Sequence, residues 1–375
     1  MPPAAEIARV APQSQVLLAA AVLGLPIAAA TAAQGARMVV LLVVGALLGA
    51  TLYLASFGFA SAYRRLIEQR DVAAVRAQLI MLAAATLLFA PVLAHGTWFG
   101  REVTGAVAPA GVSVAVGAFL FGIGMQLAGG CGSGTLYAAG GGQLRMAMTL
   151  VAFIAGSFWA SLHMDAWSAL PALEAIALGE RLGWPAAVAA QLGVFAVLYL
   201  LLGAYRGGGS ASPLGWTLAL GALALAILNL MTLIIAGHPW SITWAFALWG
   251  AKAASAFGWE PAAAGFWSAG FQRNALESSL FADVTSVMDL GLVLGALAAA
   301  GAAGSFSLRY RISPRAALTA LLGGLAMGYG ARIAYGCNIG AFFSGVASTS
   351  LHGWLWIGAA LPGCWAGLWL LRRFA

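Results

Sequence analysis

The sequence predicts an all-α polytopic membrane protein with about ten spans, folded as a single transmembrane domain over residues 1–375. Three observations indicate this fold class. The chain is 62% hydrophobic and only 8% charged, whereas a soluble domain carries about 25% charged residues. Many stretches approach the run of about 18 apolar residues that a membrane helix needs. The alternating apolar and polar pattern of membrane β-barrels is absent from the sequence.

Ten apolar segments are candidate spans. They lie at residues 16–33, 38–61, 78–95, 110–128, 146–162, 185–205, 214–236, 285–303, 315–330 and 353–371. The segment 238–284 is also partly apolar, but Pro239, Lys252, Pro261 and Arg273 interrupt it. We expect this segment to be an inserted hairpin of short helices that enters and leaves the membrane on one side.

The arginines indicate which side of the membrane each loop faces, because cytoplasmic loops carry an excess of basic residues. With the N-terminus in the cytoplasm, the residues that fall inside are Arg64, Arg65, Arg70, Arg76, Arg145, Arg206, Arg309, Arg311, Arg315, Arg372 and Arg373. The loop 163–184 then lies outside and carries three acidic residues against Arg181. We therefore expect both termini in the cytoplasm, and we attribute the net charge of +7 to topology rather than to nucleic-acid binding.

A motif of glycines around a cysteine occurs twice, with about 206 residues between matched positions. The copies read Gly117-x4-Gly122-x-Gly124-x5-Gly130-Cys131-x2-Gly134 and Gly323-x4-Gly328-x-Gly330-x5-Gly336-Cys337-x2-Gly340. The predicted topology sends the two copies in opposite directions. We therefore expect an inverted repeat, with one copy at about 16–162 and the other at about 185–373. In transporters built this way, substrate sites lie near the midplane on broken helices.

The two cysteines are expected to lie on central re-entrant loops. The stretch 129–142 has seven glycines in fourteen residues, and glycine weakens a helix by about 1 kcal/mol relative to alanine, so we expect this stretch not to be a regular helix. Irregular backbone at membrane depth lines cavities or is buried in protein, and its free N–H groups attract anions. We predict that Cys131 and Cys337 line a substrate path. The supporting loop residues are Gly130, Gly132, Ser133, Gly134, Gly336, Asn338 and Gly340.

The alternative is that the glycines serve only close helix packing and that the cysteines are inert small hydrophobes. The duplication of the Gly-Cys pair disfavours this alternative for Cys131 and Cys337. Cys364 has no counterpart in the first half of the chain. For Cys364 we favour packing, with a contact to the substrate path as the alternative.

Ionisable residues inside membrane proteins are functional candidates, because they are costly to bury. Lys252 and Arg332 are candidates for attracting an anion. The alternative for Lys252 is a side chain that extends to the interface, and for Arg332 it is a partner at a helix C-terminus. Asp283 and Asp289 are candidate partners of Arg273 or Lys252. The histidines form no ligand cluster, so we predict neither a metal site nor a cofactor.

The segments GGCGSGTL and GYGARIAYGCNIGAFFSG, followed by SLHGWLW, resemble the YeeE/YedE family of sulfur-transport membrane proteins, and the resemblance extends from about residue 38 to 373. It implies a bacterial inner-membrane protein that takes up thiosulfate, with Cys131 and Cys337 as the thiols along the path. A cytoplasmic sulfur-carrier protein of the TusA type is the candidate partner, besides the lipid bilayer. The family's further cysteine in an FCF-like segment is replaced here by Gly58, in SFGFASAYRR.

We therefore expect a transporter rather than an enzyme. Thiosulfate is a dianion, and a bare dianion cannot be buried in an apolar path. Neutral thiols offer S–H donors, so transient hydrogen bonds could pass the ion along. Two alternatives remain: a transporter of another sulfur or selenium compound, and a thiol–disulfide oxidoreductase in which Cys131 and Cys337 cycle. The oxidoreductase is disfavoured because the chain has no CxxC sequence.

Overall fold

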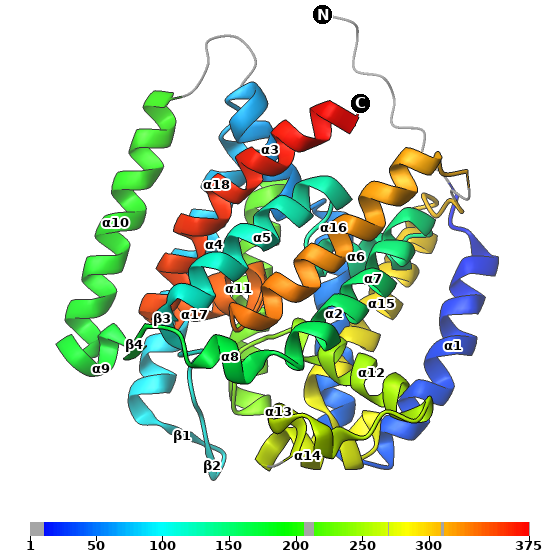
Figure 1. Cartoon of the computed structure of the whole chain (residues 1–375). Coiled ribbons are helices and arrows are strands. Elements are labelled where there is room, and N and C mark those ends of the chain that lie inside the picture. Colours follow the sequence, from blue (N-terminus) through cyan, green and yellow to red (C-terminus); the bar gives the residue numbers. More distant parts are fainter. Residues whose placement is uncertain (1–10, 206–213, 269, 309–310, 375) are drawn as a thin grey trace, which may run out of the picture.

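The computed structural model describes residues 11–205, 214–268, 270–308 and 311–374, which are mostly helical (Figure 1). Ten helical segments in the described part of the chain are long and apolar enough to cross a membrane, which confirms the predicted number of spans. They lie at Ser14–Ala32, Ala36–Gln69, Ala73–His95, Val112–Gly140, Leu144–Ser161, Trp184–Tyr205, Trp216–Ala236, Val284–Ala302, Pro314–Ala347 and Leu351–Arg373. Arg206 and Arg309, which the sequence places in cytoplasmic loops, lie outside the described residues.

Several of these spans contain more than one helix. The α-helices are α1 (Ser14–Ala32), α2 (Ala36–Leu54), α3 (Phe59–Gln69), α4 (Ala73–His95), α5 (Val112–Ala128), α6 (Gly132–Gly140), α7 (Leu144–Ser161), α8 (Met164–Ser168), α9 (Leu178–Leu182), α10 (Trp184–Tyr205), α11 (Trp216–Ala236), α12 (Thr243–Ala256), α13 (Gly265–Ser268), α14 (Gly270–Glu277), α15 (Val284–Ala302), α16 (Pro314–Ile333), α17 (Ser344–Ala347) and α18 (Leu351–Phe374). The 3-10 helices η1 (Pro261–Ala263) and η2 (Leu280–Ala282) and the π-helix η3 (Asn338–Phe343) complete the helical elements of the described residues.

Strands contribute two small antiparallel pairs to the described part of the chain. β1 (Thr97–Trp98) pairs with β2 (Arg101–Glu102), and β3 (Pro109–Gly111) pairs with β4 (Ala172–Ala175) with a register shift at its start. Both pairs lie in connections between helices, so they add little to the architecture.

The outer helices expose apolar side chains where a soluble protein would expose polar ones. Leu25 on α1 and Leu200 on α10 are each 70% exposed. A helix that is apolar all round is typical of a membrane span. The protein is therefore a multi-pass membrane protein surrounded by lipid.

The centre of the bundle is built on α5 and α16, which pack together through glycines. A Cβ atom added to Gly117 would lie 2.5 Å from the carbonyl oxygen of Gly330, and one added to Gly124 would lie 2.5 Å from that of Gly323. Backbones come this close only where side chains are absent. Residue numbers rise along α5 as they fall along α16, so the two helices run in opposite directions.

The neighbouring helices pack in reciprocal pairs across the two halves of the chain. α5 packs against α18 and α16 against α7, while α2 packs against α15 and α11 against α4. Glycines mediate these contacts as well: Gly156 of α7 abuts the backbone of Leu325, and Gly363 of α18 abuts the backbone of Phe119.

Each Gly-Cys segment interrupts a helix. α5 ends at Ala128, Gly129 adopts a left-handed φ of 82°, and α6 begins directly after Cys131. The interruption is shorter than expected, because the stretch predicted to be irregular, 129–142, is helical from Gly132 to Gly140. In the second copy α16 ends at Ile333 and η3 begins after Cys337.

A local cap explains why α6 forms in spite of its glycines. The backbone N–H of Gly134 donates to Cys131 Sγ at 3.4 Å. The N–H and the hydroxyl of Thr135 both donate to the Cys131 carbonyl, each at 2.8 Å. The Cys131 sulfur thus accepts from one of the N–H groups that a helix start otherwise leaves free.

The two ends of the bundle differ. The short helices α12, α13 and α14 of the segment 238–284 lie together at the lower end in Figure 1, whereas α3 and the end of α18 lie at the upper end. The cavities described below open toward these two ends.

Candidate functional site

Cys131 and Cys337 occupy equivalent places at the starts of helices. Each is the N-cap of the helix that follows it, and each is fully buried. The N–H of Ile339 donates to Cys337 Sγ at 3.5 Å, as that of Gly134 does to Cys131. All three cysteines are free thiols. Both predicted thiols therefore lie where backbone N–H groups converge and the helix dipole is positive.

The two Gly-Cys segments touch each other. A Cβ atom added to Gly132 would lie only 3.2 Å from Cys337 Sγ, and α6 contacts η3. Ser133 Oγ lies 3.5 Å from Cys131 Sγ. The missing side chain at Gly132 thus leaves the Cys337 sulfur facing the backbone of the first segment.

Asn338 and Tyr63 bring buried polar groups to the same place. The Asn338 side chain is fully buried, and neither its amide nitrogen nor its amide oxygen has a hydrogen-bond partner among the described residues. The Tyr63 hydroxyl lies within reach of the Asn338 amide and near Cys131 and Cys364. Buried polar groups are normally hydrogen-bonded, so these groups are candidates for contacting a substrate.

Sequence reasoning placed Asn338 in the supporting loop but did not find Tyr63. Tyr63 lies on α3, far from both motifs in the sequence. One signal could have found it: α3 is short and strongly amphipathic, so Tyr63 lies on its buried face.

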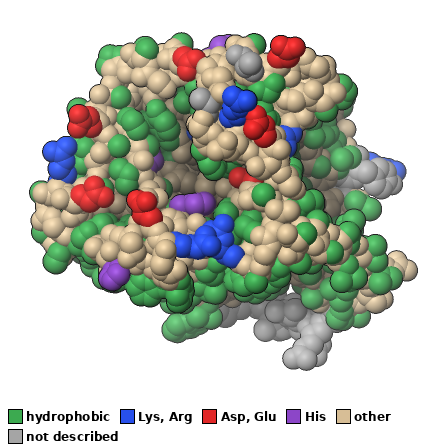
Figure 2. Space-filling view, turned by 90° about the horizontal axis from the view of Figure 1, so that it is seen from below, with side chains coloured by type: hydrophobic (Ala, Val, Ile, Leu, Met, Phe, Trp, Pro, Cys, Tyr) green, Lys and Arg blue, Asp and Glu red, His purple; other side chains and the backbone are tan. Residues whose placement is uncertain are grey.

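A cavity of about 730 Å³ opens at the lower end of the bundle, and we call it the vestibule. Figure 2 shows this face hollowed, with basic and histidine side chains beside the hollow. The lining residues used below are Arg37, His238, Ser241, Asp283, Thr285 and Arg332. A Cβ atom added to Gly340 would lie 3.3 Å from Ser241 Oγ. The vestibule therefore reaches the segment that carries Cys337.

Basic groups dominate the vestibule. The Arg332 guanidinium lies 5.2 Å from the ring centre of Phe266, and its Nε has no partner among the described residues. Asp283 is already engaged, because its carboxylate accepts hydrogen bonds from Trp244 Nε1 at 2.8 Å and from the N–H of Ser286 at 2.7 Å. Burial lowers the pKa of His238 below its usual value of 6.5, so it is neutral at pH 7. Arg37 and Arg332 are therefore the cationic side chains of the vestibule lining.

Lys252 lies apart from the vestibule lining. Its ammonium donates hydrogen bonds to the carbonyl oxygens of Leu276 at 2.7 Å and Ser278 at 2.6 Å. These bonds cap the C-terminal end of α14. The expected ion pairs of Asp283 or Asp289 with Arg273 or Lys252 are wrong. Arg273 instead forms an ion pair with Glu277 at 2.8 Å. Neither Asp283 nor Asp289 forms an ion pair among the described residues.

A second cavity of about 160 Å³ lies beside Cys131, and we call it the small cavity. The lining residues used below are Gly58, Ser61, Cys131, Tyr137 and Gln143. Gly58 follows the C-terminal end of α2, whereas Arg37 of the vestibule lies at the N-terminal end. A helix of 19 residues is about 28 Å long, so the two cavities lie at opposite ends of it. The contact of Gly132 with Cys337 adjoins the small cavity, because Cys131 lines it.

Gly58 faces two hydroxyl groups. A Cβ atom at this position would lie 2.8 Å from Ser61 Oγ and 3.5 Å from the Tyr137 hydroxyl oxygen. These hydroxyls therefore line the space into which a side chain at position 58 would point.

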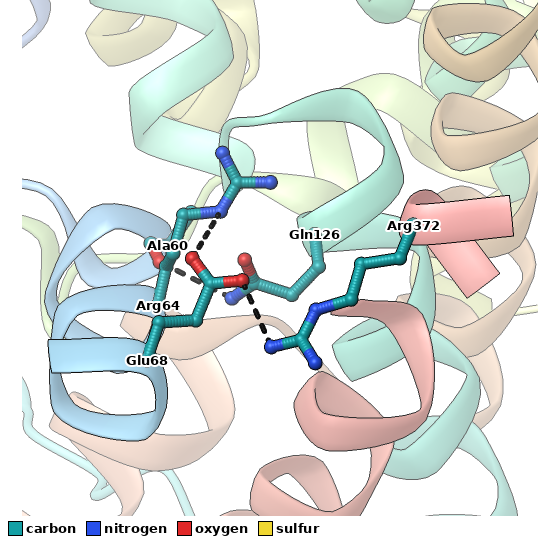
Figure 3. Close-up of polar contacts among 5 residues, drawn as sticks. All are labelled: Ala60, Arg64, Glu68, Gln126 and Arg372. Carbon is teal, nitrogen blue, oxygen red and sulfur yellow. Dashed lines mark hydrogen bonds and ion pairs between the residues drawn. The ribbon is translucent and has the colours of Figure 1, made fainter. Parts of the chain in front are cut away.

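Cys364 is a residue of α18 and is buried where this helix packs against α5. Its backbone nitrogen would lie 2.9 Å from a Cβ atom on Gly122, and its thiol lies near the Gln126 amide. Gln126 Nε2 in turn donates to the Ala60 carbonyl of α3 at 3.1 Å. Figure 3 shows this bond beside Glu68, which lies 3.4 Å from Arg372 and 3.9 Å from Arg64. These contacts hold α3 against α5 and α18 next to the small cavity.

The chain matches one protein family over most of its length. The model of the family described as "Sulphur transport" matches residues 54–366. The "Thiosulfate transporter TsuA" of Spirochaeta thermophila (strain ATCC 700085 / DSM 6578 / Z-1203) is 29% identical over 283 residues, which cover 69% of this chain and 77% of that protein. The "Probable transporter YedE" of Escherichia coli (strain K12) is 34% identical over 152 residues, 40% of this chain. This match spans only 37% of the length of that YedE.

Proposed function

The chain belongs to the Sulphur transport family, that of YeeE and YedE, and on this premise we propose that it takes up thiosulfate across a bacterial inner membrane. The substrate is passed between Cys131 and Cys337 by transient hydrogen bonds to neutral thiols. The similarity to the TsuA of Spirochaeta thermophila, a thiosulfate transporter by name, supports this substrate over other sulfur and selenium compounds.

One arrangement supports the proposal: Cys131 lines the small cavity, the neighbouring Gly132 contacts Cys337, and Ser241 of the vestibule lies next to Gly340 of the second segment. Each thiol is at a helix start, where N–H donors replace part of the hydration shell of an anion. Asn338 and Tyr63 add buried polar groups. A path must also hold its ion weakly enough to release it, and thiols are weak donors.

We further propose that about 16–162 and 185–373 form an inverted repeat, with 238–284 inserted in the second copy, and that the Gly-Cys segments are re-entrant. The opposite directions of α5 and α16 support this interpretation, as do the reciprocal contacts of α5 with α18 and of α16 with α7. Repeats of this kind place a substrate site at their interface.

The vestibule faces the periplasm and the small cavity faces the cytoplasm in this proposal. Arginine-rich α3 lies beside the small cavity, in agreement with the excess of basic residues in cytoplasmic loops. Both termini are then cytoplasmic. A TusA-type sulfur carrier would receive the substrate at the small cavity.

The proposal is tested by uptake of labelled thiosulfate into cells that lack their own sulfur-anion importers. Cells expressing the chain should accumulate label, and cells with an empty vector should not. Competition with sulfite, sulfide and selenite identifies the preferred substrate. Absence of uptake from a correctly inserted protein would contradict the proposal, and stronger competition by selenite or sulfite than by thiosulfate would reassign the substrate.

We expect Arg332, rather than Lys252, to attract the substrate. Replacing Arg332 by methionine should raise the KM for thiosulfate about fivefold to tenfold, because it removes about 1 kcal/mol of charge attraction in a partly solvated cavity. Lys252→Met is the matched control and should change KM less than about twofold, because the ammonium already binds two carbonyls. Initial uptake rates at several ionic strengths provide the measurement. A larger KM effect from Lys252→Met would reverse the assignment.

The hydroxyls of the small cavity should affect the rate of transport. Tyr137→Phe removes one hydroxyl without adding an atom, and a single hydrogen bond contributes about 0.5–1.5 kcal/mol. We expect maximal uptake to fall about threefold to tenfold with little change in KM. The control is Tyr205→Phe on the outer helix α10. Unchanged uptake by Tyr137→Phe would place the path elsewhere.

A further inference from the structure

Asp289 is a carboxyl group that the proposed mechanism does not use. It lies on α15, within a candidate membrane span, and its exposed fraction is 0%. Neither of its carboxyl oxygens has a hydrogen-bond partner among the described residues. By contrast, both carboxylate oxygens of Asp283, the N-cap of α15, accept hydrogen bonds. One comes from Trp244 Nε1 and the other from the N–H of Ser286. A structural aspartate would have such partners, and Asp289 has none.

Asp289 lies between the vestibule and Cys337. Thr285 lines the vestibule, and residues four apart lie on the same face of a helix, so Asp289 is one turn deeper along that face. It is within electrostatic range of both Asp283 and Cys337. A group in this position can exchange a proton with the vestibule and influence an anion at the Cys337 thiol.

No cation forms an ion pair with Asp289 among the described residues. The charged or titratable groups on the elements packed against α15 are Arg37 and Tyr53 on α2, Tyr137 on α6 and Lys252 on α12, in addition to Asp283 and Cys337. An isolated carboxylate without hydrogen bonds is strongly disfavoured in an apolar interior, whereas a neutral carboxyl is tolerated. Acidic groups at this depth are typical of proton relays.

We propose that Asp289 binds and releases a proton in each transport cycle, so that anion uptake is coupled to proton entry. The carboxyl takes up one proton from the vestibule side and releases it toward the small cavity, and no covalent bond of the substrate changes. While protonated, it faces the anion near Cys337 as a neutral group and does not repel it. The inference rests on the proposed uptake of thiosulfate and adds the source of energy.

The test uses the purified full chain in proteoliposomes. Exchange of labelled for unlabelled thiosulfate at equal pH measures the path alone. Uptake under an inward gradient of one pH unit should raise steady-state accumulation by up to about tenfold per coupled proton, the factor that one pH unit represents. A pH-sensitive dye inside the vesicles should report acidification when thiosulfate is added outside.

Asp289→Asn retains the size of the side chain and a hydrogen donor but cannot release a proton. It should retain exchange within about twofold, but lose the stimulation by the pH gradient and the acidification, because an amide does not titrate. Glu277→Gln changes an exposed acid on α14 and should behave as wild type. Asp289→Glu restores a titratable group and should recover acidification.

The two hypotheses fail in different ways. If wild-type protein exchanges thiosulfate but neither responds to the gradient nor acidifies the vesicles, the coupling is wrong and the proposed function stands. If Asp289→Asn remains gradient-stimulated, Asp289 is not the proton carrier. If wild-type protein shows no exchange at all, the proposed function itself is contradicted. The dye measurement on wild-type protein requires no variant, so a failure of Asp289→Asn to fold leaves the coupling testable.

Discussion

Replacing Cys337 by alanine is expected to lower thiosulfate uptake by one to two orders of magnitude, because a hydrogen bond to a charged group contributes about 1.5–3 kcal/mol. The thiol is buried, is the N-cap of η3 and faces the backbone of Gly132. Cys131→Ala should have a similar effect, because Cys131 lines the small cavity.

Cys364→Ala is the matched control for these variants. Cys364 is also a buried free thiol, but it lies on α18 against α5 and lines neither the vestibule nor the small cavity. We therefore expect uptake within about twofold of wild type when this sulfur is removed. Labelled uptake, normalised to the amount of protein in the membrane, is the measurement. Wild-type rates from both Cys131→Ala and Cys337→Ala would contradict the thiol relay.

Serine variants separate the relay from a disulfide cycle. A serine hydroxyl at position 131 or 337 can still donate a hydrogen bond, so a relay should retain part of its activity. A dithiol–disulfide cycle requires sulfur at both positions and would be abolished by serine at either one. Complete loss in both serine variants, with normal folding, would therefore favour the oxidoreductase.

Gly363→Ala is expected to destabilise the fold. The added methyl group would collide with the Phe119 carbonyl oxygen of α5, and because the obstacle is backbone, α18 and α5 would have to separate. Overpacking of this kind costs about 1–3 kcal/mol, which should lower the Tm by about 1–4 °C for a chain of this size.

The control lies five residues away on the same helix. A Cβ atom on Gly358 would meet no atom within 4 Å, and alanine favours a helix by about 1 kcal/mol over glycine. Gly358→Ala should therefore leave the Tm unchanged or raise it. The Tm of both variants is measured in detergent, together with the yield of monodisperse protein. Equal melting temperatures for the two variants would show that the contact at Gly363 is not tight.

The spans and the pair of thiols could be predicted from the sequence, because each depends on a local pattern. The lengths of the apolar segments predicted ten membrane spans. The matched spacing of the two motifs selected Cys131 and Cys337 as a pair. The regular helix α6 could not be predicted, since it depends on a cap from Cys131 and Thr135 that overrides the weak propensity of its glycines.

The tertiary features of the site could not be read from the sequence for a different reason. Tyr63 and Asp289 come from helices far from either motif, and only the packing of those helices shows where their polar groups lie and that the carboxyl oxygens of Asp289 lack partners among the described residues. Lys252 was a candidate because of its charge. The carbonyls of Leu276 and Ser278 that bind it lie at the C-terminal end of α14, and no periodicity of apolar residues in the sequence predicts where that helix ends.

Gly132 and Asn338 occupy the same position in the two copies of the motif, directly after each cysteine. Gly132 has no side chain, whereas Asn338 has an amide side chain. A duplicated gene starts with two identical halves, and either half can then drift while the other keeps its task. Here one half supplies empty space in front of the opposite thiol and the other supplies an amide without a partner among the described residues. Exchanging the two segments would therefore not give back the same protein, because the two copies of the motif place different groups beside the thiols.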